Sequence, residues 1–279
     1  MNTVTEIVKT ASEKRIPALI HQVWLDKWDL DGKPPARFQK NIERVKTLNP
    51  GFHHKVWSFR DGLALFDLPD FARWRRFFRD TLKLHIEKCD FLRYAILLCH
   101  GGVYMDVDTV LSAPLDSINI QSRSFLWVRD HEYWTHHTKY IGEKPIYNGF
   151  LASAKGHHIL RELMDFIMFT YEADGLVMCT TGPVAIGRYS RIMGLHNDPS
   201  IWGDRCWILS TDAYGRKDPV CDGKRRVVHS QGSFLESSWM LGGLVPWTRS
   251  VIRDHHLLII FFLVFLNLSV LFRPSLMPR

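Results

Sequence analysis

The sequence has few of the features that mark secreted, disulfide-bonded or zinc-binding proteins. Its five cysteines form no CxxC pair and leave one over if the others pair, so they indicate neither a zinc site nor a disulfide framework. The first twenty residues carry several charges and no apolar core, unlike a signal peptide. Internal repeats and low-complexity segments are lacking as well. With 279 residues, 46% of them hydrophobic, we expect one large domain with a short tail.

Nucleic-acid binding finds no support in the sequence beyond an excess of positive charge. The formal net charge is +7, which favours an anionic partner such as nucleic acid, an acidic membrane surface or a phosphorylated substrate. No zinc-finger, helix-turn-helix or RNA-binding pattern accompanies the charge. The densest basic stretch, residues 73–79 (RWRRFFR), is typical of a solvated helix face. We therefore expect no nucleic-acid partner.

A long apolar run occurs near the end of the chain. Residues 257–272 (LLIIFFLVFLNLSVLF) carry no charge and are flanked by Arg253 and Arg273. As a helix this run would be about 24 Å long, somewhat short of the roughly 30 Å hydrocarbon core of a membrane, and snorkelling of the arginines would close the gap. A buried core helix is the alternative, although a helix apolar on every side has little left to pack against at this position. We predict a single-pass membrane anchor in residues 251–279.

The first part of the chain has the pattern of strand, helix and strand. Residues 18–24 (ALIHQVW) form a short apolar run and predict a buried strand. Residues 38–48 have helical spacing, and residues 54–58 alternate like a second strand. This order is typical of a parallel α/β sheet. Further along, the patterns predict strands at 124–128, 147–153 and 226–229, a helix at 158–172 and another helix that opens at 180–183.

A predicted helix leads directly into the segment that carries the chemistry. Residues 81–100 place apolar side chains three and four apart, which predicts a helix with one apolar face. Gly101 and Gly102 end it, because glycine accepts the left-handed conformation of a helix stop. A short strand follows, and Asp106 and Asp108 stand at its carboxyl end.

Two carboxylates at a strand end predict a divalent metal site. Asp106 and Asp108 are separated by one residue, so in an extended segment they project to the same side. Mg²⁺ and Mn²⁺ prefer hard oxygen ligands and leave positions open for phosphate oxygens. A metal held there neutralises a departing diphosphate, as transfer of a sugar from a nucleoside diphosphate requires. Such triplets also occur in solvated loops, so the surrounding residues decide their meaning.

The surrounding residues resemble a known family of enzymes. The stretch 88–94 (KCDFLRY), followed by 101–108 (GGVYMDVD), resembles the signature of DxD-motif glycosyltransferases, the family of yeast-type α-mannosyltransferases and inositol-phosphoceramide mannosyltransferases. The resemblance covers roughly residues 17–239. It implies an α/β fold of the GT-A-like, Rossmann type, which binds a nucleotide sugar on a mostly parallel sheet. The catalytic domain would take up residues 1–250, followed by the C-terminal hydrophobic helix.

The same resemblance assigns donor-binding residues on both sides of the DxD motif. Asp90 and Arg93 correspond to the helix pair that holds the donor sugar and diphosphate, with an ordinary i,i+3 ion pair as the alternative. Trp24 corresponds to the aromatic residue near the nucleotide base, with burial in the core as an equal alternative. Asn148 lies in a segment that matches the family's NGF, near the acceptor side. Gly182 lies in its TGP, at a helix start whose free N–H groups can meet phosphate or sugar oxygens.

The remaining site residues come from the end of the predicted domain. Relatives often place a histidine a few residues before a Ser-Trp pair, which supplies a further metal ligand and a group against the diphosphate. Here His229 precedes Ser238 and Trp239 by a longer gap than in those relatives. We predict His229 as a third metal ligand, with a structural histidine as the alternative, and Ser238 and Trp239 as donor-binding residues.

The residues and the resemblance together predict a metal-dependent retaining glycosyltransferase. Its expected catalytic residues are Asp106, Asp108 and Arg93, and its expected cofactor is Mn²⁺ or Mg²⁺. The donor would be a GDP- or UDP-linked hexose, with mannose favoured, and the acceptor a glycan or a lipid. The alternatives are a metal-dependent phosphatase or phosphotransferase and a non-catalytic, membrane-tethered protein that binds nucleotide sugars. The predicted anchor implies membrane association, either in the Golgi or endoplasmic reticulum or at the cytosolic face.

Overall fold

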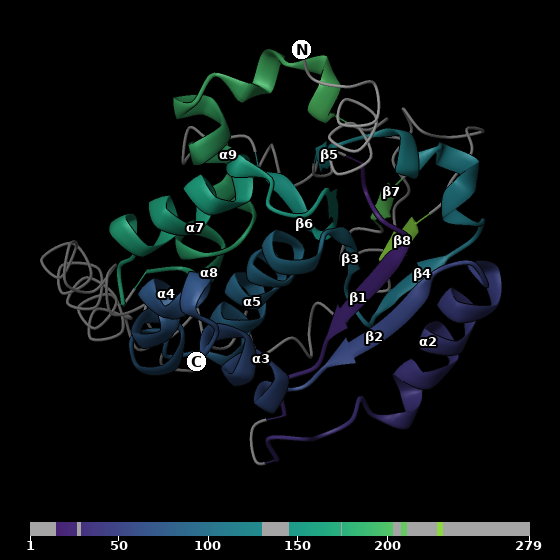
Figure 1. The fold of residues 1–279 in the computed structure, drawn as a ribbon, viewed down its shortest axis with the longest axis horizontal. Helices are drawn as coiled ribbons and strands as arrows, with labels where there is room; N and C mark the ends of the chain where they lie inside the picture. Colours follow the sequence, from purple (N-terminus) through teal and green to yellow (C-terminus); the bar gives the residue numbers. More distant parts are fainter. Residues whose placement is uncertain are drawn as a thin grey trace, which may run out of the picture.

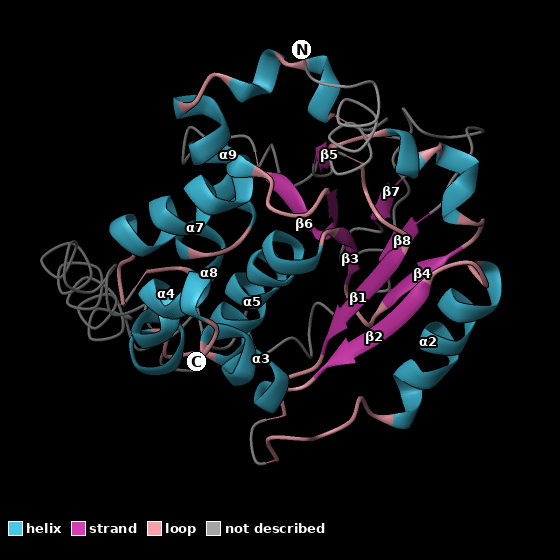
Figure 2. Cartoon of the chain, viewed as in Figure 1, coloured by secondary structure: helices cyan, strands magenta, loops and turns pink. Residues whose placement is uncertain are grey.

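The computed structural model describes residues 15–26, 29–129, 145–173 and 175–202, and beyond them only the backbone of two short strands. At its centre is a sheet of five strands in the order β2-β1-β3-β6-β5 (Figure 1; Figure 2). The strands are β1 (Leu19–Val23), β2 (His53–Trp57), β3 (Gly102–Met105), β5 (Phe125–Arg129) and β6 (Ile146–Ser153). Each of them confirms a strand predicted from the sequence.

The sheet is mixed, and the prediction of a mostly parallel sheet is wrong. β1 runs parallel to both of its neighbours, β2 and β3, whereas β6 pairs antiparallel with β3 and with β5. The strand, helix and strand at the start of the chain do produce the parallel half. The direction in which distant strands pair depends on tertiary contacts that a local pattern does not contain.

Helices cover both faces of the sheet. α2 (Ala36–Leu48) lies on one side, whereas α5 (His85–His100), α7 (His158–Thr170) and α9 (Pro183–Ile192) lie on the other (Figure 1). Shorter segments complete the fold: α3 (Phe59–Phe66), α4 (Ala72–Arg76), a π-helix (Phe77–Thr81), α8 (Val177–Thr180) and 3₁₀ turns at Pro69–Phe71, Leu115–Ile118, Ile120–Ser122, Leu195–Asn197 and Pro199–Ile201. The four predicted helices are confirmed, although α5 begins four residues later than the predicted residue 81.

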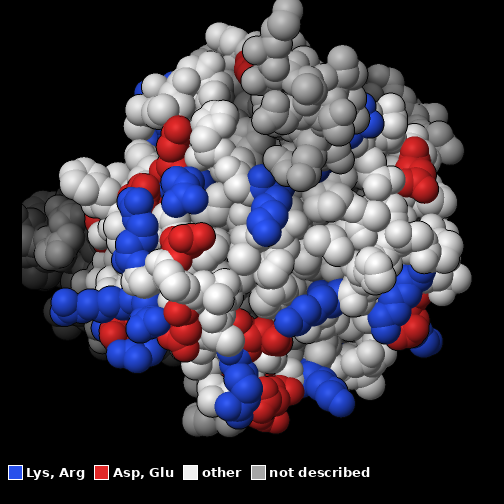
Figure 3. Space-filling model, viewed as in Figure 1, with Lys and Arg blue, Asp and Glu red and all other residues white. Residues whose placement is uncertain are grey.

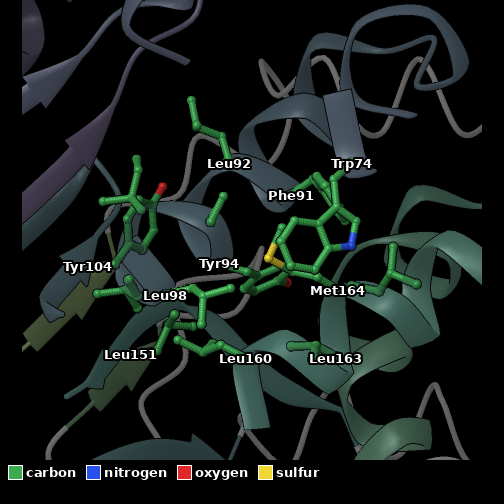
Figure 4. Packing of buried hydrophobic residues seen from close by; sticks show 14 of the residues in the cluster. Trp74, Phe91, Leu92, Tyr94, Leu98, Tyr104, Leu151, Leu160, Leu163 and Met164 are labelled. Carbon is green, nitrogen blue, oxygen red and sulfur yellow. The ribbon is translucent and has the colours of Figure 1, made fainter. Parts of the chain in front are cut away.

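Apolar side chains pack against both faces of the sheet, because successive strand residues point in opposite directions. Tyr104 of β3 and Leu151 of β6 point into a core shared with α5 and α7 (Figure 4). Val103 and Met105 of β3 point into the opposite core, which includes Val45 of α2. Burial on both faces explains why these strands are short apolar runs in the sequence.

The helix that leads to the site is fixed at both ends. At its N-terminus the carboxylate of Glu87 accepts hydrogen bonds from the backbone N–H groups of Lys83 and Leu84, at 3.0 and 2.9 Å, at the turn where helix donors lack partners. At its C-terminus Gly101 adopts a φ of 69°, and a Cβ there would lie 2.6 Å from the backbone N of Lys155. Glycine alone fits this stop, so β3 begins directly after α5.

A second sheet of three strands follows the end of β3. It consists of β4 (Thr109–Leu111), β7 (Ile208–Ser210) and β8 (Val228–Ser230), in the order β4-β8-β7. β8 runs antiparallel to β4, with Thr109 opposite Ser230 and Val110 opposite His229. β8 overlaps the strand predicted at 226–229, whereas β4 was not predicted, because three residues are too few for an alternating pattern to be recognised.

Charged side chains of both signs are interspersed on the face seen in Figure 3. Within residues 73–79 the aromatic side chains are buried, and Arg73, Arg75 and Arg79 each form an ion pair with an aspartate. This confirms the predicted solvated helix face. Among the described residues no helix is long and apolar enough to cross a membrane. The predicted anchor, residues 251–279, lies outside them.

Candidate active site

The two aspartates predicted to hold a metal follow β3 in a tight turn. Asp106 stays attached to the sheet because its N–H donates to the carbonyl of Gly149, at 3.0 Å. The carbonyl of Asp106 accepts from the N–H of Thr109, also at 3.0 Å, which closes a β-turn. The prediction of an extended segment is wrong here. The chain bends after Asp106, so the two aspartates share a turn and not one face of a strand.

The carboxylate of Asp106 is oriented by two buried side chains. Its Oδ1 accepts a hydrogen bond from the hydroxyl of Tyr104, at 2.7 Å, and lies 3.4 Å from Nη1 of Arg93. The side chain of Asp106 is 33% exposed, against 3% for Arg93. An oriented carboxylate that solvent can still reach suits a metal ligand, whose outer partners fix its direction.

The other oxygen of this carboxylate lies directly over Gly149. A Cβ on Gly149 would stand 2.6 Å from Oδ2 of Asp106 and 2.6 Å from the hydroxyl oxygen of Tyr147. Both distances are far below van der Waals contact, so with the carboxylate in this place the position accepts glycine alone. The NGF segment thus forms one wall of the site.

Asp108 lies close enough to Asp106 for the two charges to repel. Burial raises the pKa of Asp108 to about 7, the charge of Asp106 adds to the shift, and Arg93 opposes it. Two carboxylates lose this mutual penalty when they share a cation, and oxygen ligands fit Mg²⁺ or Mn²⁺. The described part of the chain contains no group of three His, Cys, Asp or Glu side chains placed to hold a metal. Phosphate oxygens, water or residues outside that part would therefore complete the coordination.

Asp90 and Arg93 form a buried ion pair one turn apart on α5, with 2.8 Å between Oδ1 and Nη2. Asp90 also accepts hydrogen bonds from the amide of Asn148 and the hydroxyl of Thr181, both at 2.9 Å. Burial raises the pKa of Asp90 to about 6, against the opposing charge of Arg93. Because the two side chains are only 5% and 3% exposed, this is not the weak surface pair that i,i+3 spacing alone indicates.

Arg93 links this ion pair to the DxD turn. Its Nη1 donates to the backbone carbonyl of Asn148, at 2.7 Å, and its guanidinium carbon lies 4.7 Å from the ring centre of Tyr104. One buried cation thus stands between a carboxylate of the helix and a carboxylate of the turn. The structure brings together five of the predicted site residues: Asp90, Arg93, Asp106, Asp108 and Asn148.

The TGP segment joins the same cluster through Thr181, which the sequence interpretation did not single out. Besides its bond to Asp90, Thr181 accepts a hydrogen bond at its carbonyl from the hydroxyl of Tyr94, at 2.9 Å. Gly182 precedes Pro183, the first residue of α9, as predicted. A Cβ on Gly182 would lie 3.4 Å from Oδ2 of Asp90. The donor-binding roles of Gly182 and Asn148 stay predictions, and a polar residue inside a matched motif is the signal that points to Thr181.

Trp24 follows the last residue of β1, at the same end of the sheet as the carboxyl end of β3. Its ring packs against Phe38, with 5.6 Å between the ring centres. Its indole N–H is buried and has no hydrogen-bond partner in the structure that is described. The side chain is only half-buried and belongs to neither core cluster. A place at the nucleotide base stays a prediction.

The later predicted residues lie largely outside the described structure. Of His229 only the backbone is described, and β8 places it beside Val110, two residues after Asp108. Ser238 and Trp239 lie outside the described residues. A metal-binding role for His229 and donor-binding roles for the other two therefore stay predictions.

Other side chains hold the backbone of the turn, and sequence reasoning missed them. Nε2 of Gln22 donates to the carbonyl of Asp106, at 3.2 Å, and Nδ2 of Asn41 donates to the carbonyl of Val107, at 3.4 Å. Their importance depends on which carbonyl they face, which only the tertiary structure shows. Tyr104 was also missed, although its position two residues before Asp106 in a strand is a usable signal.

Comparison with known proteins confirms the resemblance. Residues 35–125 match the family described as glycosyltransferase sugar-binding region containing DXD motif. The chain is 35% identical over 95 residues to an uncharacterised glycosyltransferase of Acanthamoeba polyphaga mimivirus, which covers 34% of this chain and 36% of that protein. It is 27% identical over 207 residues to inositol phosphoceramide mannosyltransferase 3 of Schizosaccharomyces pombe. The aligned part makes up 71% of this chain and 51% of that protein. The initiation-specific α-1,6-mannosyltransferase of Candida albicans is 29% identical over 168 residues. The aligned part makes up 54% of this chain and 42% of that protein.

The chain thus spans about a third to a half of the length of these relatives. Among solved structures, the PaToxG glycosyltransferase aligns with a TM-score of 0.49 at 16% identity, over 69% of this chain and 77% of that chain. The galactosyltransferase LgtC aligns with a TM-score of 0.43 at 12% identity, over 82% and 95%. Residues 35–125, which carry Asp90, Arg93 and the DxD turn, are thus the part of the chain that matches the glycosyltransferase sugar-binding region containing DXD motif.

Proposed function

We propose that the chain is a metal-dependent glycosyltransferase that moves a hexose from a nucleoside-diphosphate sugar to a glycan or lipid acceptor. The observation that carries the proposal is the pairing of Asp106 with Asp108 at the end of β3, beside the buried charge of Arg93. Mannose is the favoured sugar, because the relatives include mannosyltransferases of two yeasts. Either GDP or UDP would serve as the nucleotide.

In this proposal Asp106 and Asp108 hold Mn²⁺ or Mg²⁺, which neutralises the charge of the leaving diphosphate when it is bound. Tyr104 and Arg93 keep the Asp106 carboxylate in one orientation, so that it need not reorganise during the reaction. Arg93 also places a fixed positive charge behind the turn. The chain's own contribution is thus a pre-oriented pair of carboxylates backed by a buried cation.

Asp90 is proposed to contact the donor sugar. A carboxylate has about four acceptor positions, and in the described structure three of them receive Arg93, Asn148 and Thr181. The position left on Oδ2 would take a sugar hydroxyl. We further infer a retaining reaction, in which the bond from the anomeric carbon to the acceptor oxygen forms as the bond to the phosphate oxygen breaks. The acceptor's proton passes to the leaving phosphate, so the chain need not supply a base.

The C-terminal segment, residues 251–279, is proposed as a membrane anchor on the basis of its sequence. An anchored domain meets acceptors that are themselves membrane-bound, such as a lipid headgroup or a membrane glycan. Golgi, endoplasmic reticulum and the cytosolic face are all compatible with this arrangement.

The proposal is tested with the full-length chain by the release of nucleoside diphosphate from GDP- and UDP-sugars in the presence of Mn²⁺ or Mg²⁺. Asp106→Asn and Asp108→Asn remove the charge of each carboxylate, and we expect both to abolish metal-dependent release. Asp116→Asn is the matched control, because Asp116 is an exposed aspartate in the next turn of the chain. The rate of this control variant should equal that of the parent.

Other outcomes identify the alternatives. Release of phosphate from an aryl phosphate, without turnover of any nucleotide sugar, would support a phosphatase. Binding of a nucleotide sugar without turnover would support a tethered binding protein. Parent-like rates in both aspartate variants would remove the proposed role of the turn.

A further inference from the structure

Two side chains that have no part in the reaction proposed above are linked by hydrogen bonds to the backbone of the DxD turn. Gln22 lies on β1 and is fully buried. Its Nε2 donates to the carbonyl of Asp106, at 3.2 Å. His54 lies on the neighbouring strand β2, and its Nε2 is 2.8 Å from Oε1 of Gln22. A path of two hydrogen bonds thus runs from β2 through β1 to the turn.

The carbonyl at the end of this path determines the direction of both hydrogen bonds. A carbonyl oxygen accepts and never donates, so the amide of Gln22 must present its NH₂ group to Asp106 and its oxygen to His54. His54 must then carry its proton on Nε2 and donate it to Gln22. Burial lowers the pKa of His54 to about 4, so its ring is neutral near pH 7 and this single tautomer completes the path.

The carbonyl of Asp106 is also the closing atom of the turn. It accepts from the N–H of Thr109, at 3.0 Å, as well as from Gln22, so both of its lone pairs are used. The peptide group that contains this carbonyl is planar and joins Asp106 to Val107. Rotation of that group changes the direction in which the chain carries Asp108 relative to Asp106. The spacing of the two carboxylates therefore depends on what holds the carbonyl.

We propose that Gln22 and His54 are positioning residues of the metal site. His54 orients the amide of Gln22, and Gln22 holds the DxD turn in the conformation in which Asp106 and Asp108 bind one divalent ion. The inference rests on the proposed metal-dependent function, although its effect on the backbone of the turn can be measured without a metal.

Four variants of the full-length chain test the inference. Gln22→Met keeps the length of the side chain and removes both of its polar groups. His54→Leu removes the donor to Gln22, whereas His54→Gln restores an N–H donor at similar reach. His53→Leu is the matched control, because His53 is the preceding residue of β2, is exposed, and points to the other face of the strand.

Two quantities are measured for each variant. The first is the dissociation constant for Mn²⁺, from the electron paramagnetic resonance of the free ion. The second is the rate of hydrogen exchange of the Thr109 amide without metal. Gln22→Met should weaken Mn²⁺ binding about 10- to 100-fold, as the loss of outer partners of metal ligands does, and should speed the exchange. His54→Leu should change both in the same direction. His54→Gln and His53→Leu should stay within about two-fold of the parent on the same scale.

Urea unfolding of each variant distinguishes positioning from general destabilisation. Unchanged Mn²⁺ affinity and unchanged exchange in Gln22→Met and His54→Leu would overturn the inference, and so would an equal effect of His53→Leu. If Gln22→Met does not fold, the pair of substitutions at His54, which is only half-buried, decides the question. If the parent binds no Mn²⁺ and Asp106→Asn behaves identically, the proposed function fails. Exchange of the Thr109 amide then decides alone whether Gln22 and His54 hold the turn.

Discussion

Asp106 has three kinds of neighbour: the hydroxyl of Tyr104, the guanidinium of Arg93 and the bare Cα of Gly149. The first two attract one carboxylate oxygen, and the third leaves room for the other. A Cβ on the glycine would lie 2.6 Å from the carboxylate and equally close to the hydroxyl of Tyr147. The direction of the Asp106 carboxylate therefore depends on the missing Cβ at Gly149 as well as on the hydrogen bond from Tyr104 and the ion pair with Arg93.

Gly149→Ala is expected to displace the carboxylate of Asp106. The new Cβ would stand 2.6 Å from Oδ2, and the backbone cannot simply withdraw, because the carbonyl of Gly149 accepts from the N–H of Asp106. A misplacement of about 1 Å costs on the order of 100-fold in rate, which is the loss we expect in donor hydrolysis. Gly51→Ala is the matched control, since nothing lies within 4 Å of a Cβ there. Full activity in Gly149→Ala would show that Asp106 tolerates another position.

The buried imidazole of His21 should make the free energy of unfolding depend on pH. Its Nδ1 accepts from the indole N–H of Trp57, at 3.2 Å, so its Nε2 carries the proton and donates to the carbonyl of Gly101, at 2.9 Å. Burial lowers the pKa of His21 from 6.5 to about 4. Between these values the unfolded chain binds a proton that the folded chain does not. The stabilisation is therefore complete above about pH 6.5 and is lost as the pH falls toward 4.

The contribution of His21 between pH 7 and pH 5 amounts to about 2 kcal/mol of unfolding free energy. His21→Gln keeps one donor and one acceptor but does not titrate. We expect urea unfolding at pH 7, 6 and 5 to show a shallower loss of stability in this variant, by about that amount. Parallel pH dependences in parent and variant would show that the folded chain accommodates the protonated ring.

At the scale of elements, Asp90 joins three segments of the chain. It belongs to α5 and accepts from Asn148 of β6 and from Thr181 just before α9. Removal of one partner from a buried ion pair costs about 3–5 kcal/mol. We expect Asp90→Ala to lose about 3 kcal/mol, the lower end of that range, because Asp106 still lies 3.4 Å from Arg93.

Urea unfolding at pH 7 measures this loss against Glu43→Ala. Glu43 is exposed and forms an i,i+3 pair with Lys46 on α2, so its removal should leave the unfolding midpoint unchanged. If Asp90→Ala is as mild as Glu43→Ala, the buried pair does not hold the three segments together.

The same scale shows what local sequence patterns can and cannot predict. Short apolar runs and alternation located the strands of the central sheet, and the glycine pair located the helix stop at Gly101, because these signals depend on neighbouring residues. The first turn of the helix predicted from residue 81 was wrong, because Thr81 is the last residue of the preceding π-helix and α5 begins only at His85. There Nζ of Lys88 donates to the carbonyls of Phe78 and Arg79, at 2.7 and 2.8 Å. A side chain that binds carbonyls about ten residues away leaves no periodic trace.

The residues of the candidate site also divide into those that the sequence predicted and those that it did not. Asp90, Arg93, Asp106 and Asp108 were found because they lie in one continuous motif. Of their partners, Thr181 lies 91 residues after Asp90 and Gln22 lies 84 residues before Asp106, and they are brought in by the start of α9 and by the sheet. Nothing local marks Gln22, whereas Thr181 is marked only by its place in the TGP segment.

At the scale of the whole molecule, metal binding should raise the thermal stability of the folded chain. A ligand at 100 times its dissociation constant stabilises the folded state by about 2.7 kcal/mol, and each kcal/mol raises the melting temperature by about 2–4 °C in a domain of this size. We expect Mn²⁺ to raise the melting temperature of the parent and of Asp116→Asn, and to leave Asp108→Asn unchanged. A shift of equal size in Asp108→Asn would place the ion elsewhere.

The position of Arg93 between carboxylates has a consequence for the order of events. Asp90, Asp106 and Asp108 together carry up to three negative charges when ionised, against one positive charge from Arg93. Without an ion the cluster repels a diphosphate, whereas one divalent cation offsets the remaining two charges. We expect donor affinity to be negligible in a chelator and to appear only with metal. If the proposed function holds, the geometry predicts an ordered kinetic scheme, in which the cation enters before the nucleotide sugar or together with it.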